Sequence, residues 1–79
     1  MEEQHIIIFG RAGCVFCDKA VALCESLGLD YVYHDINVEG ITKEDLSEIT
    51  GTIVTTVPQI FENTTYIGGY SEFEQKFNK

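Results

Sequence analysis

Two cysteines lie three positions apart in the segment GRAGCVFCDK, and their spacing suits them to chemistry of their own. Cys14 and Cys17 fall between Gly13 and a segment with the apolar spacing of a helix. Helical geometry would place their Cα atoms about 5 Å apart, within the window of roughly 4.4–6.8 Å that a disulfide requires. The pair could therefore hold a metal, brace a small fold, or form and break a disulfide during a reaction.

Metal binding and structural bracing are the weaker alternatives. Zinc sites usually pair one CxxC with another CxxC or with a spaced histidine pair. This chain adds only Cys24, His5 and His34, none of them at a diagnostic spacing, and His34 is predicted to be a polar sheet residue. A bridge between such close cysteines closes too short a loop to stabilise a fold much. Redox chemistry is therefore the predicted use, with no metal site.

The two cysteines differ in their places on the predicted helix. Cys14 lies at its start, where unpaired N–H groups and the helix dipole favour a thiolate, and Arg11 and Lys19 are close in sequence. The dipole alone, at about 1 kcal/mol, raises the thiolate fraction near pH 7 only from about 3% to about 15%, so other donors must contribute. Cys14 is the predicted attacking thiol and Cys17 the resolving thiol. Cys24, seven positions further on, is predicted to be a small core residue.

A second candidate region surrounds the single proline, in TTVPQIF. Pro58 has no N–H for a strand ladder, which suits a strand start or edge, and a cis bond before it is an open alternative. If the turn is tight, the N–H and C=O of Val57 lie beside the cysteines. They could then pair with the backbone of an extended thiol substrate, as an added strand does. The other interpretation is that Pro58 merely starts a strand.

The segment IGGYSEFE carries a third candidate region. Gly68 and Gly69 permit a sharp turn, and the N–H groups of Ser71 and Glu72 could then bind a carboxylate at the start of a helix. The Glu72 side chain would repel a carboxylate but pair with an ammonium group, so a ligand with an α-amino-acid end would satisfy both features. A turn followed by a helix cap explains the same residues equally well.

A small α/β domain of residues 1–79, with the element order β-α-β-α-β-β-α, must position these candidates. The predicted strands are 5–9, 30–36, 57–61 and 64–67, and the predicted helices are 14–27, 43–50 and a last helix. Ser71 and Glu74 predict a capping box for that last helix, with Phe73 and Phe77 on one face. The strand-helix-strand unit favours parallel pairing. The expected architecture is a four-stranded mixed sheet flanked by three helices.

Composition excludes several classes of partner. The net charge is −8, with 13 acidic residues against 5 basic ones, which argues against nucleic acid and anionic membranes. No apolar run approaches the roughly 20 residues that span a bilayer. The start, MEEQH, lacks the basic region of a signal peptide. We therefore expect a cytoplasmic protein, in a compartment where structural disulfides are rare.

Taken together, these motifs resemble the glutaredoxin family, in particular its small dithiol form with a minimal thioredoxin-like fold. The likeness covers nearly the whole chain and is densest in IFGRAGCVFC, YVYHDI, EGITKEDL, TVPQIF and IGGYSEF. A CxxC alone is weak, but a CxxC, a TVP and a GGY in this order form a specific signature. The resemblance implies a monomeric, glutathione-dependent thiol–disulfide oxidoreductase without a bound cofactor.

The resemblance also implies roles for individual residues. Cys14 attacks a glutathione mixed disulfide or a protein disulfide, Cys17 resolves the protein-bound intermediate, and glutathione restores the enzyme. Ribonucleotide reductase is an implied protein partner, because family members reduce it. The implied glutathione-binding residues are Arg11 near the glycine carboxylate, Phe16, Thr56 and Val57 before a cis Pro58, and Tyr70, Ser71 and Glu72 at the γ-glutamyl end.

The chain departs from the family between the two cysteines. The usual motif is Cys-Pro-Tyr-Cys, whereas Val15 and Phe16 stand here. Phe16 keeps an aromatic wall without a hydroxyl, and Val15 restores a backbone N–H near the Cys14 sulfur. Some glutaredoxins without this proline bridge an iron–sulfur cluster between two subunits, using the first cysteine and bound glutathione. A redoxin reduced by thioredoxin reductase is the second alternative.

Overall fold

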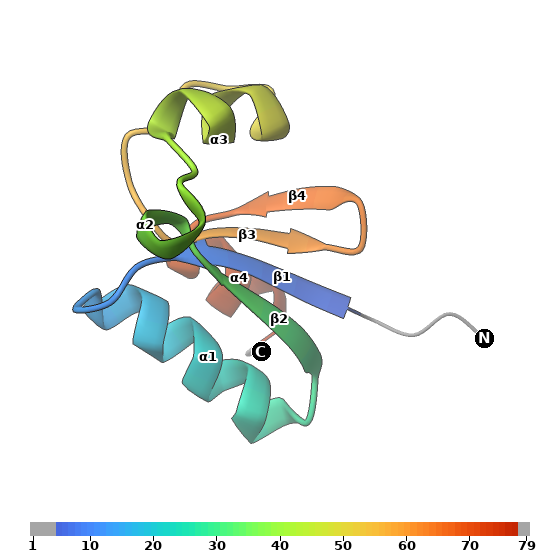
Figure 1. Ribbon diagram of the computed structural model, residues 1–79. Coiled ribbons are helices and arrows are strands. Elements are labelled where there is room, and N and C mark those ends of the chain that lie inside the picture. The colour runs from blue at the N-terminus through green and yellow to red at the C-terminus, as the bar shows by residue number, and fades with distance from the viewer. Residues whose placement is uncertain (1–4, 78–79) are drawn as a thin grey trace.

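The apolar run near the start of the chain forms β1 (His5–Gly10), an inner strand of a four-stranded sheet (Figure 1). The structure, a computed structural model, describes residues 5–77. The strand order is β2-β1-β3-β4, with β1 and β2 parallel and the other neighbours antiparallel. The predicted mixed sheet is thus confirmed. The other strands are β2 (Asp30–Asp35), β3 (Gln59–Glu62) and β4 (Thr65–Gly68).

Four helices accompany the sheet within the described residues, one more than predicted. They are α1 (Val15–Leu27), α2 (Ile36–Glu39), α3 (Lys43–Thr50) and α4 (Tyr70–Phe77). The additional helix, α2, is a single turn that follows β2 directly. The Asp35 side chain caps it by accepting the N–H groups of Asn37 and Val38, and Gly40 ends it at φ 70°. One turn is too short to show a periodic pattern, so the sequence gives no sign of it.

Helices α1 and α4 pack together against one face of the sheet (Figure 1). Strands β1 and β3 supply three isoleucines to this cluster, and the helices supply Phe73 and Cys24, both fully buried. The prediction that Cys24 is a core residue is therefore confirmed. Phe73 and Phe77 lie on one face of α4, as predicted, with ring centroids 5.2 Å apart. This packing fixes the first turns of α1 and α4 on the same side of the sheet.

A second, smaller cluster covers the opposite face of the sheet. Leu46 of α3 is fully buried there with Ile36 and Val54, against Phe9 and Val57. Because Phe9 follows Ile8 along an extended strand, its side chain points to the face opposite that of Ile8. Val57, which belongs to a predicted functional region, is therefore anchored in this cluster.

The start of α4 corrects the predicted capping box. The helix begins at Tyr70, and the N–H of Gly69 donates to Oε1 of Glu72 over 2.8 Å. The predicted Ser71–Glu74 pairing was therefore wrong, and Glu74 instead accepts the Tyr70 hydroxyl over 3.3 Å. The reason lies at Gly68, with φ 131°, where a Cβ would stand 3.0 Å from Glu72 Cγ. Only glycine lets Glu72 fold back over the turn in this way.

Strand β3 begins later than predicted, at Gln59 instead of Val57. Pro58 has no N–H to donate to the strand ladder, so regular pairing starts only after it. The bond between Val57 and Pro58 is cis, as the resemblance implied.

Candidate active site

Cys14 is the N-cap residue of α1. Its Sγ accepts the N–H of Cys17 over 3.3 Å, and its carbonyl accepts the N–H of Asp18 over 3.1 Å. A side-chain acceptor at this position normally comes from Ser, Thr, Asp or Asn. A thiolate would accept the same N–H more strongly than a thiol, because the bond becomes charge-assisted. The start of α1 therefore directs a backbone N–H at the Cys14 sulfur.

Cys17 is enclosed more completely than Cys14. Its side chain is 0% exposed, whereas Cys14 retains 8%. Burial raises the pKa of the Cys17 thiol to about 11, and the neighbouring Cys14 contributes in the same direction. Cys17 is therefore a neutral thiol near pH 7, and only Cys14 is open to an incoming sulfur. The division into an attacking Cys14 and a resolving Cys17 stays a prediction, which this difference in exposure supports.

The segment before β3 reaches the cysteines as predicted. The Val57 carbonyl lies 3.8 Å from Cys14 Sγ, in position to accept its S–H. A cavity of about 280 Å³ opens along this segment. Its lining residues come from α1, the loop before β3 and the start of α4, and they are Phe16, Thr56, Val57, Pro58, Gly69, Tyr70, Ser71 and Glu72.

A second cavity, of about 470 Å³, adjoins the first because both are lined by Thr56 and Val57. Two cations, Arg11 and Lys43, line it. Ile36, Asn37 and Thr55 complete its lining. The structure thus brings every residue that the resemblance assigned to glutathione into two adjoining cavities, with Arg11 in one and the α4 residues in the other.

The two cavities hold different charged groups: the first has helix N–H groups and the Glu72 carboxylate, and the second has the two cations. The first holds the start of α4, where helical geometry leaves the N–H groups of Tyr70, Ser71 and Glu72 without intrahelical acceptors. The first intrahelical bond of α4 runs from the Phe73 N–H to the Gly69 carbonyl, over 3.1 Å. One oxygen of Glu72 accepts the Gly69 N–H, which leaves its second oxygen for a cation. An amino-acid end fits this cavity, and a lone carboxylate fits the cavity with the cations.

Two aromatic rings form a wall of the first cavity. The centroids of Phe16 and Tyr70 are 5.9 Å apart, which links the first turns of α1 and α4. The Lys19 ammonium also lies over the Phe16 ring, 5.2 Å from its centroid. Phe16 therefore keeps the aromatic wall that the sequence predicted, in contact with a second ring.

Comparison with known proteins agrees with this geometry. A family model described as Glutaredoxin matches residues 6–67, which include both cysteines and the proline segment. The chain belongs to the glutaredoxin family. Its Cys14–Cys17 pair is therefore that of a thiol–disulfide oxidoreductase, and its fold is the thioredoxin-like fold of glutaredoxins.

Individual glutaredoxins resemble this one over most of their length. Glutaredoxin 1 of Escherichia coli is 50% identical over 75 residues, which cover 89% of this chain and 88% of that protein. A glutaredoxin of Haemophilus influenzae is 51% identical over 76 residues, covering 90% and 87%. The structure of reduced E. coli glutaredoxin superimposes with a TM-score of 0.84 at 46% identity, covering 94% and 93%. A buckwheat glutaredoxin–glutathione complex gives a TM-score of 0.77 at 25% identity, covering 92% of this chain and 67% of that one.

Three residues that line or support the glutaredoxin site carry no motif in the sequence. Lys43 lies 13 positions before Thr56, so only the fold reveals that the two share a cavity. Gln59 is 5% exposed and donates from Nε2 to the Thr56 carbonyl over 2.9 Å. The hydroxyl of Tyr33 donates to the Arg11 carbonyl over 3.2 Å. Gln59 begins the run QIF, which predicts only an apolar strand. Tyr31 and Tyr33 lie two positions apart in β2, and this alternation is the one sequence feature that places both on the same face of the strand.

The remaining sequence candidates play no part in this site. His34 pairs with Glu39 through Nδ1 at 2.9 Å and stacks on Phe9 with centroids 5.2 Å apart, as a polar sheet residue would. Within residues 5–77, no three metal-ligating side chains gather into a cluster. No helix in the described part of this glutaredoxin has the length and apolarity to cross a bilayer.

Proposed function

We propose that this glutaredoxin uses glutathione as its reductant and binds it across the two adjoining cavities. The observation that carries the proposal is the pairing of an amino-acid site at α4 with a cationic site at Arg11 and Lys43. Glutathione has a γ-glutamyl amino-acid end and a glycine carboxylate on either side of its thiol. Val57, beside the Cys14 sulfur, lines both cavities, which would leave that thiol near Cys14.

Each implied residue has a role in this binding mode. The N–H groups of Ser71 and Glu72 bind the γ-glutamyl carboxylate, and the Glu72 carboxylate binds the ammonium group. Arg11 binds the glycine carboxylate with help from Lys43. The ligand backbone extends along the protein segment between these ends, with Thr56, Val57, Pro58, Phe16 and Tyr70 as the contacts.

The reaction proceeds by two thiol–disulfide exchanges. The Cys14 thiolate attacks the glutathione sulfur of a glutathionylated protein, the mixed disulfide breaks, and the protein leaves as a thiolate that takes a proton from water. A second glutathione thiolate then attacks the glutathione sulfur on Cys14, which releases oxidised glutathione and restores the Cys14 thiolate. With a protein disulfide, the first attack joins Cys14 to one protein sulfur and releases the other as a thiolate. Cys17 then loses its proton to water and attacks Cys14 Sγ, which releases the protein as a thiolate and leaves a Cys14–Cys17 disulfide. Two glutathione molecules reduce this disulfide and leave as oxidised glutathione.

The protein partner proposed for the second route is ribonucleotide reductase, on the basis of the family resemblance. We propose a monomeric state on the same basis, and a cytoplasmic location on the basis of the sequence features given above. Reduction of the disulfide of purified ribonucleotide reductase by glutathione and this protein, followed as restored reductase activity, tests the partner.

Turnover of a glutathionylated peptide, coupled to NADPH through glutathione reductase, tests the main proposal. We expect activity in the wild type and in Cys17→Ser, and none in Cys14→Ser. Cys24→Ala is the matched control, since it removes a buried cysteine away from the site and should retain activity. Turnover that requires thioredoxin reductase instead of glutathione, or a brown iron–sulfur chromophore without turnover, would overturn the proposal in favour of the corresponding alternative.

A further inference from the structure

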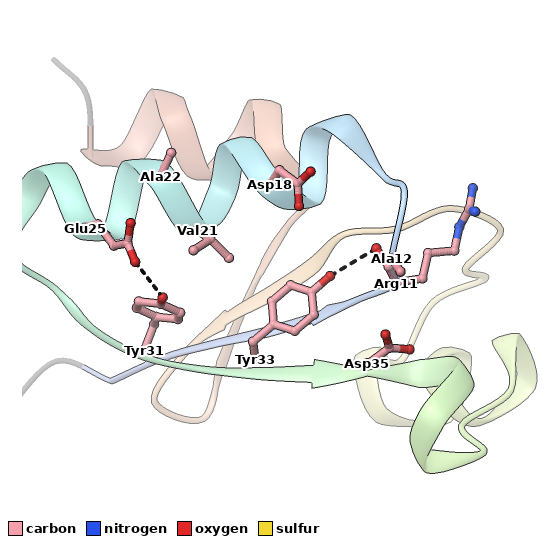
Figure 2. A pocket seen from close by; sticks show the side chains of 9 residues that line it. All are labelled: Arg11, Ala12, Asp18, Val21, Ala22, Glu25, Tyr31, Tyr33 and Asp35. Carbon is pink, nitrogen blue, oxygen red and sulfur yellow. Dashed lines mark hydrogen bonds between the residues drawn. The ribbon is translucent and has the colours of Figure 1, made fainter.

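A third cavity, of about 470 Å³, lies between α1 and β2 and shares Arg11 with the cationic cavity of the proposed glutathione site. Figure 2 shows two tyrosines of β2, Tyr31 and Tyr33, rising from the strand toward α1. The hydroxyl of Tyr31 donates to Glu25 over 3.0 Å, in the last turn of α1. The hydroxyl of Tyr33 reaches the active-site loop instead and donates to the Arg11 carbonyl over 3.2 Å.

Gly10 shows how closely Tyr33 approaches the resolving thiol. A Cβ built on Gly10 would lie 2.5 Å from Tyr33 Oη and 2.8 Å from Cys17 Sγ. The Tyr33 hydroxyl oxygen and the Cys17 sulfur therefore both border the space that a side chain at position 10 would fill, and glycine is the only residue that leaves this space empty. The absence of a side chain at position 10 therefore lets the Tyr33 hydroxyl and the Cys17 thiol approach each other.

We propose that the Tyr33 hydroxyl is a hydrogen-bond donor to the Cys17 thiolate whenever that thiolate forms. In the reduced protein the hydroxyl hydrogen points to the Arg11 carbonyl. When Cys17 loses its proton, the hydroxyl turns by rotation about its C–O bond and donates to Cys17 Sγ. The proposal rests on the assignment of Cys17 as the resolving thiol.

The surroundings of Cys17 support this role. A thiolate enclosed at 0% exposure needs donors, and two groups lower the pKa of Cys17 against the effect of burial: the Arg11 backbone and the Tyr33 side chain. The phenol keeps its proton at working pH, because burial raises the pKa of Tyr33 to about 12. The charges of Cys17, Asp35 and Cys14 act on it in the same direction.

The donor matters in both directions of the dithiol reaction. When a reductant thiolate attacks Cys14 Sγ of the oxidised protein, the Cys14–Cys17 bond breaks and its electron pair goes to Cys17 Sγ. Cys17 leaves as a buried thiolate before it takes a proton. In the reverse direction the same thiolate attacks Cys14. The single-thiol exchange at Cys14 never charges Cys17, so Tyr33 should have no effect on it.

Reduction of the oxidised protein by dithiothreitol tests the proposal without any use of glutathione. Tyr33→Phe should slow this reduction about tenfold, as expected for loss of one hydrogen bond to a charged group. In a Cys14→Ser background it should also raise the pKa of Cys17, followed by the NMR chemical shift of the cysteine Cβ. Tyr31→Phe is the matched control, because Tyr31 lines the same cavity, and it should reduce at the wild-type rate.

Equal rates for wild type and Tyr33→Phe would overturn the proposal, as would equal slowing by Tyr31→Phe. If Tyr33→Phe does not fold, 3-fluorotyrosine at position 33 keeps the shape and makes the phenol a stronger donor. It should then speed reduction, and an unchanged rate would contradict the proposal. Failure of the glutathione proposal would appear separately, as absent turnover with glutathione beside a normal reaction with dithiothreitol.

Discussion

The backbone N–H of Cys17 donates to the Sγ of Cys14 over 3.3 Å, so the side chain of one cysteine caps the helix that carries the other. This relationship depends on the backbone of α1 and not on the identity of the two residues between the cysteines. The departure from the usual Cys-Pro-Tyr-Cys motif therefore leaves the N-cap geometry intact.

Val15→Pro should stabilise the protein. Val15 is the first helical residue and its side chain is 64% exposed, and Cys14 before it is extended at φ −98° and ψ 112°, as proline requires. We expect the free energy of unfolding to rise by about 0.4–1 kcal/mol, measured by urea denaturation. Asp18→Pro is the control and should destabilise by about 3 kcal/mol, because it removes the bond from the Asp18 N–H to the Cys14 carbonyl. A loss of stability in Val15→Pro would contradict the prediction.

Arg11→Met and Lys43→Met should each raise the KM for glutathione about two- to fivefold, with kcat unchanged. The reason is that each removes one exposed cation from the cavity proposed for the glycine carboxylate. The effect should shrink at high salt. Lys76→Met is the control, since Lys76 pairs with Glu62 at 3.4 Å on another part of the surface. A KM that changes in neither Arg11→Met nor Lys43→Met would show that the glycine carboxylate does not bind in this cavity.

Glu72→Gln and Glu72→Ala should separate the two roles of this carboxylate. Glutamine keeps an oxygen for the Gly69 N–H but loses the charge, so KM for glutathione should rise while stability changes little. Alanine also loses the helix cap and should lower the free energy of unfolding by about 1 kcal/mol. Coupled turnover and thermal denaturation measure the two effects. Equal KM values for Glu72→Gln and the wild type would show that the charge does not bind the ligand.

Gln59→Leu should loosen the loop that faces Cys14. Gln59 is buried between the Tyr66 hydroxyl, which donates to Oε1, and the Thr56 carbonyl. Leucine leaves both partners without this bond, at a cost of about 1–3 kcal/mol. Tyr66→Phe keeps the bond to Thr56 and serves as the control. Amide hydrogen exchange should accelerate near Val57 only in Gln59→Leu, and acceleration in both variants would assign the effect to Tyr66 instead.

Stability of the reduced protein should fall between about pH 9 and pH 11. Burial raises the pKa of Cys24 from 9.0 to about 11, so over this interval the unfolded chain loses a proton that the folded chain retains. The folded state then binds more protons than the unfolded state, and a rise in pH favours unfolding. Below pH 9 both states are protonated and stability is fully present. Cys24→Ala should reduce this alkaline loss of stability by on the order of 1–2 kcal/mol at pH 11. Urea denaturation in the presence of a reductant measures the free energy of unfolding at each pH. If Cys24→Ala has the same pH profile as the wild type, the loss does not come from Cys24.

Much of the fold follows from local patterns. The apolar run of β1 and the helical spacing of α1 are strong signals, and α1 ends at Leu27 as predicted, with Gly28 at φ 68° after it. The start of α4 was misplaced because Ser71 and Glu74 have the residue types of a capping box. The fold instead uses Gly69 and Glu72, which only the close approach of Glu72 to the glycine turn reveals.

The site was less predictable where it depends on residues distant in the chain. Cys14 and Val57 could be named from local motifs, but their contact over 3.8 Å spans 43 positions. Lys43 carries no motif, and its place beside Arg11 results from the packing of α3. Tyr33 lies next to Cys17 because parallel pairing sets Tyr33 opposite Ile8 in the register of β1 and β2.

The central position of β1 also has a consequence during protein synthesis. Its parallel partner, β2, is complete by residue 35, whereas its antiparallel partner, β3, ends only at residue 62. At about 5–20 residues per second, the ribosome leaves one edge of β1 unpaired for roughly 1–5 s after β2 is made. Three consecutive isoleucines line that strand, a segment prone to pair with other chains. During that interval the unpaired edge of β1 is open to pairing with the strand of another chain.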